Sequence, residues 1–182
     1  LEGLFFTENK SAIGWSRLNT LIKSNLLQSK TTPVFSENFL LGVTSFEVKK
    51  PAEDIKEEDT SLEVVDPLRY REELPTRKDL FILIGVKSFA DVFPIMRSWE
   101  GNLFANLREV LGIPVTVETN YLLKKEWRDG IVQNKNARVL TDKAGNIVLM
   151  YVYANDNHII VTNTEEAVKE IIERLVTSKV RK

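Results

Sequence analysis

The fold is decided by residues 138–162, RVLTDKAGNIVLMYVYANDNHIIVT. Three runs rich in β-branched and aromatic residues, at 138–141, 146–153 and 158–162, are separated by two segments of turn-forming residues. This alternation predicts an antiparallel meander of three strands. The middle run is apolar on both of its faces, so we expect a central strand that is covered by a helix on at least one side.

A helix directly follows this meander and is the obvious cover for it. Between residues 164 and 178 the apolar side chains recur at helical spacing and charged side chains fill the other face. Asn163 followed three residues later by Glu166 fits a capping box, and acidic residues in the first turn agree with the helix dipole. The apolar positions are Ala167, Val168, Ile171, Ile172, Leu175 and Val176.

Upstream, the run from Leu80 to Val86 predicts another buried strand, and Ser88 fits the cap of a second helix. Gly112 and Pro114 indicate where that helix stops, whereas Pro94 inside the pattern predicts a kink or a separate first turn. The apolar stripe of this helix comprises Val92, Met96, Trp99, Leu103, Leu107, Val110 and Leu111.

The N-terminal part repeats the theme with short strands at 4–6 and 12–15, a helix that starts near Ser16 and a strand at 39–46. We expect the strand at 39–46 to neighbour the one at 80–86, joined by a long charged and partly mobile insertion at about 47–79. The prediction is therefore a single α+β domain over residues 1–182. Its mainly antiparallel sheet is covered by about three helices.

The composition limits the functions that are open to such a domain. Among 182 residues, 25 Lys and Arg stand against 26 Asp and Glu, which gives a net charge of −1. This balance lacks the basic footprint of a nucleic-acid-binding protein or of one drawn to acidic lipid surfaces. There is no cysteine and a single histidine, so thiol chemistry, Cys-ligated metals and histidine-rich metal sites are excluded.

No catalytic, cofactor-binding or metal-ligating residues are assigned from the sequence. A nucleophile elbow and a phosphate-binding loop are both missing. His158, with Asp156 two residues away, is typical of a surface or hydrogen-bonding histidine at the start of a strand. Oxygen-bearing residues that lack the spacing of a calcium loop fit turns instead. These are Asp142, Asn146, Asp156 and Asn157.

Trp127 is the residue that points most directly to a partner. It lies in the polar setting Lys124-Lys125-Glu126-Trp127-Arg128-Asp129, so we expect its ring to be exposed and to contact another molecule. The candidate partner-binding residues are Trp127, Arg128, Glu126 and, within the insertion, Tyr70.

Several segments resemble an uncharacterised family of membrane-anchored, extracytoplasmic proteins from candidate-phylum bacteria. The resemblance covers most of the chain except the charged insertion, and it implies a single N-terminal membrane anchor upstream and a domain that faces away from the cytoplasm. It implies no catalytic residues. The similar segments are residues 6–8, 36–42, 81–89, Met96, 99–100, 129–140 and 142–162.

The first functional hypothesis is accordingly a non-enzymatic cell-envelope domain that binds a protein or an envelope polymer. We expect it to bind no nucleic acid and to contact the membrane only through its anchor. The alternative is a glycan-binding or glycan-hydrolysing domain in which Trp127 or Trp99 stacks on a sugar beside Glu126 or Glu100. A cytosolic regulatory domain is a third possibility.

Overall fold

The computed structural model describes residues 2–4, 7–8, 11–12, 20, 34–47, 76–110, 116–117 and 119–180. The chain divides into two compact units, Leu1–Thr44 with Asp79–Lys182, and Ser45–Lys78. Both α-helices of the described part belong to the first unit. The helix predicted from Ser16 lies outside the described residues apart from Thr20. Residues 48–75 of the predicted insertion, including Tyr70, lie outside them as well.

Seven strands form one sheet, which together with the helices confirms the α+β class. Every pairing whose register is resolved is antiparallel. A separate two-stranded sheet pairs β2 (Thr7–Glu8) with β3 (Ser11–Ala12). Across the large sheet the order is β1 (Glu2–Leu4), β4 (Phe35–Glu47), β5 (Thr76–Val86), β9 (His158–Thr162), β8 (Ile147–Asn155), β7 (Lys135–Thr141) and β6 (Arg128–Val132).

The predicted meander is confirmed as β7, β8 and β9. Arg138 lies opposite Tyr151, and Tyr151 lies opposite Val161 on the next strand. The predicted neighbours at 39–46 and 80–86 correspond to β4 and β5, which are adjacent in the sheet. Non-local pairing completes the sheet, because β5 pairs with β9, with Ile84 opposite Ile159.

Strand β6 was not predicted from the sequence. It pairs with β7 through a two-residue loop, Gln133-Asn134, in which both residues have positive φ (50° and 58°). This is the backbone of a type I′ turn, whose twist matches that of the flanking strands. Because β6 comes last in the strand order, its outer edge pairs with no other strand in the described part of the chain.

Helix α2 (Phe89–Leu107) begins as predicted, with the Ser88 hydroxyl accepting a hydrogen bond from the Asp91 amide at 3.4 Å. It runs through Pro94 without interruption, so the prediction of a separate first turn is wrong. The helix ends at Leu107, earlier than the stop expected at Gly112. A 3-10 helix, η1 (Asn120–Lys124), lies between α2 and β6.

Helix α3 (Glu165–Val180) confirms the predicted C-terminal helix, but its capping residue differs from the predicted one. The Ala167 amide donates to the Thr164 hydroxyl at 3.4 Å, so Thr164 caps the helix in place of Asn163. Neither α2 nor α3 is both long and apolar enough to cross a membrane, and the same holds for all described helices.

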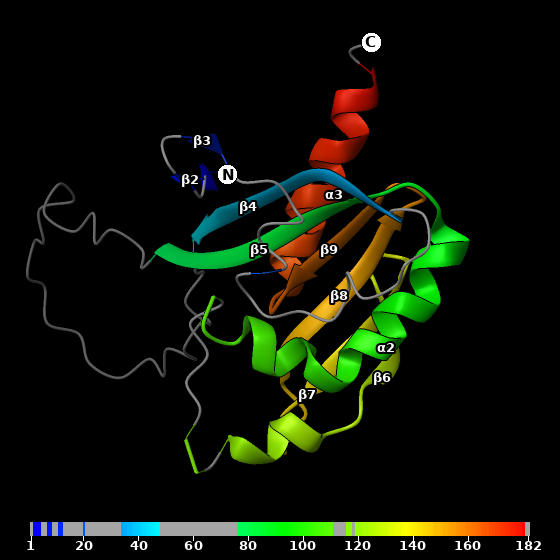
Figure 1. Cartoon of the computed structure of the whole chain (residues 1–182). Helices are drawn as coiled ribbons and strands as arrows, with labels where there is room; N and C mark the ends of the chain where they lie inside the picture. Colours follow the sequence, from blue (N-terminus) through cyan, green and yellow to red (C-terminus); the bar gives the residue numbers. More distant parts are fainter. Residues whose placement is uncertain are drawn as a thin grey trace, which may run out of the picture. The chain divides into compact units, whose positions relative to one another are not determined.

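The two helices cover opposite faces of the sheet, as Figure 1 shows with α2 in front of the strands and α3 behind them. Alternation along β8 supplies both cores, because successive side chains of a strand point to opposite faces. Leu149, Tyr151 and Tyr153 belong to the core under α2, whereas Met150, Val152 and Ala154 belong to the core under α3.

Candidate functional site

A groove runs along one side of α2 and is the candidate functional site. It consists of three hollows of about 240, 460 and 660 Å³ that adjoin through shared lining residues. We call it the α2–β6 groove. Its helical wall is formed by residues three or four apart along α2, which places them on one side of the helix. These residues are Phe89, Phe93, Arg97, Glu100 and Gly101.

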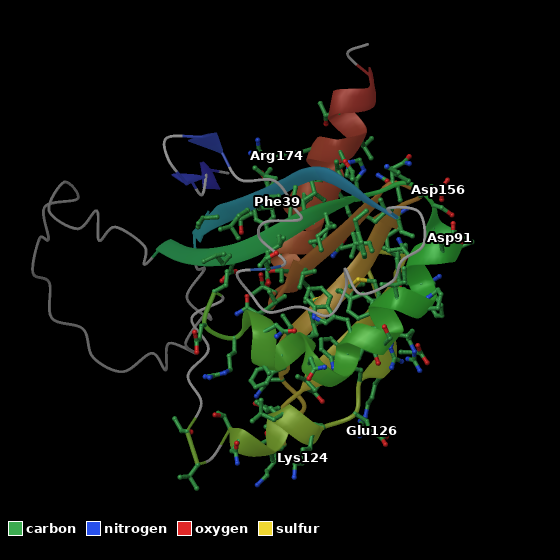
Figure 2. All side chains as sticks on the ribbon, in the orientation of Figure 1. Phe39, Asp91, Lys124, Glu126, Asp156 and Arg174 are labelled. Atoms are coloured by element: carbon green, nitrogen blue, oxygen red, sulfur yellow. The ribbon has the colours of Figure 1, made fainter. Side chains whose placement is uncertain are left out.

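The opposite wall is formed by the β6–β7 hairpin and the segment that precedes it. Residues 134–136 line the small hollow, residues 129–131 the middle one, and residues 123–127 the large one. The groove therefore follows β6 from its end at the small hollow to its start at the large one. In Figure 2, Asp91 and Asp156 lie near the start of α2, whereas Lys124 and Glu126 lie near η1.

The middle hollow has apolar walls that are open to solvent. Phe93 on α2 is 43% exposed and Ile131 on β6 is 77% exposed. The side chain of Ile131 lies on the α2 face of the sheet. Ile131 and Asp129 are two residues apart on one strand, so their side chains share a face. Asp129 lies opposite Arg138, whose side chain bonds Glu100 of α2. The buried ring of Tyr153 lines the same hollow, and its centroid is 5.8 Å from that of Phe93.

The floor of the groove is an ion-pair network centred on Arg138 of β7, whose side chain is 7% exposed. Its Nε and Nη2 atoms donate to the two carboxylate oxygens of Glu100 at 2.8 and 3.0 Å. Nη1 donates to Asp129 at 2.7 Å, and Nη2 also donates to the Trp127 carbonyl at 2.9 Å. A bidentate pair of this kind fixes both partners, so Arg138 holds α2 against β7.

Two aromatic side chains complete the network. The Tyr151 hydroxyl donates to Glu100 Oε1 at 2.6 Å, and the Trp127 indole N–H donates to the Glu100 carbonyl at 3.0 Å. The rings of Trp127 and Tyr151 are also in contact, with centroids 5.6 Å apart. Glu100 thus accepts from two strands and from the segment before β6, and every one of these bonds joins α2 to the sheet side of the groove.

The pKa shifts in this network stabilise the protonated forms of its members. Hydrogen bonding to Glu100 raises the pKa of Arg138 above its usual value, against the opposing effect of burial. Burial, followed by the hydrogen bond to Glu100, raises the pKa of Tyr151. A guanidinium and a phenol that both keep their protons are suited to holding structure and are poor general bases.

Burial also raises the pKa of the Tyr153 hydroxyl to about 12, from an ordinary value of 10.0. Because this folded-state pKa lies above the unfolded one, the resulting stability is complete below pH 10 and is lost as the pH rises toward 12. Urea denaturation between pH 9 and 11.5 should show the loss, with a slope of at most about 1.4 kcal/mol per pH unit per tyrosine. Tyr153→Phe should flatten this slope, and an unchanged slope would contradict the assignment.

The structure contradicts the exposed position predicted for Trp127. Trp127 is only 8% exposed, because its ring packs on Tyr151 and its indole N–H donates to the Glu100 carbonyl. Trp99 is buried too, at 1%, and donates to Asn106. The glycan alternative therefore lacks the exposed ring that it required.

The other predicted partner-binding residues have separate outcomes. Glu126 and Arg128 are exposed, and Glu126 lines the large hollow of the groove. Tyr70 lies outside the described residues. Four large apolar or aromatic residues that line the middle and small hollows were not singled out: Phe89, Phe93, Ile131 and Tyr153. A signal for two of them exists, since Phe89 and Phe93 are one helical turn apart, with Phe89 at the edge of the apolar stripe and Phe93 just beyond it.

The residues considered for metal or acid–base chemistry act in turns. Asp142 accepts from the amide and the side chain of Asn146 at 2.8 and 2.9 Å, and Nδ1 of His158 lies 3.0 Å from Asn155 Oδ1. Within the described ranges there is no cluster of three or more acidic or histidine side chains suited to a metal ion.

Comparison with known proteins adds no relative. No family model, curated protein or solved structure matches this chain. The resemblance to extracytoplasmic proteins noted from the sequence stays a prediction.

Proposed function

We propose that this protein is a non-enzymatic protein-binding domain, and that the α2–β6 groove holds an extended segment of its partner. The segment adds to the outer edge of β6 as a further strand and places side chains against Phe93 and Ile131. The observation that carries this proposal is the outer edge of β6, which pairs with no strand among the described residues, beside two exposed apolar side chains that line one hollow. Edge strands with such a neighbouring groove are templates for strand addition.

The backbone of β6 directs amide and carbonyl groups toward the side where an added strand would lie. The type I′ turn is closed by a hydrogen-bonded pair between Val132 and Lys135. Hydrogen-bonded and non-hydrogen-bonded pairs alternate along an antiparallel ladder. The amide and carbonyl groups of Asp129 and Ile131 therefore face away from β7, where an added strand would meet them.

The two walls also agree in length. From Phe89 to Gly101 the helix rises by about 18 Å. From Arg128 to Val132 the strand β6 spans about 14 Å, and residues 123–127 extend this wall beyond its start. A segment of five or six residues can thus pair with the whole of β6 while its alternate side chains face α2.

The non-enzymatic part of the proposal is supported by the engagement of the acidic and phenolic groups at the groove floor. Both carboxylate oxygens of Glu100 accept hydrogen bonds, and the Tyr151 phenol keeps its proton. The extracytoplasmic location is proposed on the family resemblance alone, and fractionation of cells that express the natural gene tests it separately.

Selection from a library of random ten-residue peptides tests the groove, followed by calorimetric titration of the peptides that bind. Ile131→Ala should weaken binding by about 10- to 50-fold, because most of this side chain is still available for burial. Ile131→Pro should weaken it further, since it also removes the amide that pairs with the added strand.

Val176→Ala is the matched control, because Val176 is 60% exposed on α3, on the opposite face of the sheet. This variant should bind as the parent protein does. Failure to select any peptide, or equal affinities for the Ile131→Ala and Val176→Ala variants, would reject the groove as the binding site.

A further inference from the structure

We infer that the partner segment carries a carboxylate on the C-terminal side of its apolar residues, and that this carboxylate lies in the large hollow beside η1. This inference rests on the proposed function, since it concerns the composition and direction of the segment in the same groove.

The direction follows from the geometry of strand pairing. An antiparallel addition is slightly more stable per residue than a parallel one and is the commoner kind. A segment antiparallel to β6 starts at the Val132 end and finishes at the Arg128 end. The Arg128 end adjoins residues 123–127, which line the large hollow, so the C-terminal part of the segment lies there.

The charges of the groove are unevenly distributed between its two ends. The small hollow contains one cation, Lys135, and one carboxylate, Asp156. The large hollow is lined by four cations and only two carboxylates. These are Arg97, Lys124, Lys125 and Arg138 with Glu100 and Glu126.

Much of the negative charge near the large hollow is already engaged. Glu100 serves both Arg138 and Arg97, the latter at 3.6 Å. Lys124 and Lys125 form no salt bridge with any described carboxylate. Lys125 is positioned by bonds from Nζ to the Asp142 carbonyl at 2.9 Å and the Thr141 hydroxyl at 3.4 Å.

An ammonium has three protons to donate, so this arrangement leaves Lys125 a donor for an incoming anion. Lys124 adds a second positive charge on the same wall of the hollow, and it is exposed. A carboxylate delivered by the bound segment would gain both cations without displacing the Arg138–Glu100 pair.

The test uses one peptide selected on the full chain and resynthesised in matched forms. In the first set, an acidic residue one or two places after the second apolar residue is changed to Gln or Lys. In the second set, the free C-terminus is replaced by an amide. A loss confined to the first set identifies a side-chain carboxylate, and a loss confined to the second identifies the terminal one.

The neutral peptide should bind about 3- to 10-fold more weakly than the acidic one, and this difference should shrink in high salt. Lys124→Glu should reverse the preference and favour the Lys-containing peptide. Lys169→Glu, on the exposed face of α3, should leave the preference unchanged.

Two failures can be told apart. If no peptide binds at the groove, the proposed function fails together with the inference. If peptides bind and depend on Ile131 but acidic, neutral and amidated forms have equal affinities, only the inference fails. Inorganic phosphate, added at constant ionic strength, is the last competitor to be tested. If phosphate displaces the acidic, neutral and amidated peptides equally well, the assignment of the large hollow to a peptide carboxylate is wrong.

Discussion

The Arg138→Met variant should lose about 3 to 5 kcal/mol of unfolding free energy in urea denaturation at pH 7. Removal of the guanidinium leaves the Glu100 carboxylate, whose side chain is 12% exposed, without its bidentate partner. The partners that stay, the Tyr151 hydroxyl and the half-exposed Arg97 at 3.6 Å, compensate this charge only in part, and a poorly compensated buried charge costs far more than the loss of a surface ion pair. The bond to Asp129 contributes little to this loss, because the Asp129 side chain is 91% exposed.

A triple variant combines Arg138→Met with Glu100→Met and Tyr151→Phe. It separates two contributions to the loss of unfolding free energy, the unpaired Glu100 carboxylate and the lost packing. It removes the charged pair and the hydroxyl that donates to it. The triple variant should be clearly more stable than Arg138→Met alone, because it leaves no buried carboxylate without its partner, while both variants lose the bond to the Trp127 carbonyl equally. Additive losses from the three substitutions would show that the network is not coupled as the structure has it.

The Trp127→Ala variant should lose about 3 to 5 kcal/mol of unfolding free energy. Trp127 is 8% exposed, its ring packs on Tyr151 and its indole N–H donates to the Glu100 carbonyl, so truncation leaves a cavity and removes this hydrogen bond. The prediction from sequence is the opposite, since an exposed partner-binding tryptophan would change stability little.

Two further variants make this comparison decisive. Trp127→Phe should lose clearly less than Trp127→Ala, since most of the ring volume stays. Ile131→Ala should change stability by about 0.5 kcal/mol or less, because Ile131 is 77% exposed. A stable Trp127→Ala protein that binds no selected peptide would support the exposed arrangement and contradict the structure.

What the sequence predicts well is set by short-range patterns. The runs at 138–141, 146–153 and 158–162 alternate with turn formers, and they are strands in the structure. Ser88 is the cap of α2, as its position before an apolar stripe indicated. Such features depend on residues a few positions apart, and a single sequence displays them directly.

What it does not predict depends on residues that meet from far along the chain. Trp127 has charged neighbours in the sequence, yet its position is decided by Glu100, 27 residues away. The Arg138–Glu100 pair joins residues separated by 38 positions. Strand β6 was missed because Arg128, Asp129 and Gly130 resemble a loop, and because its turn lacks the glycine that marks most such hairpins.

The pairing of β5 with β9 has a consequence for how the protein is made. Ile84 leaves the ribosome 75 residues before its partner Ile159, which at 5 to 20 residues per second is a wait of about 4 to 15 s. During that time the apolar strand Leu80–Val86 lacks its partner along the edge that later pairs with β9. Chaperones or other nascent chains can bind this edge. The rate of translation across residues 86–159 is therefore expected to govern the yield of folded protein.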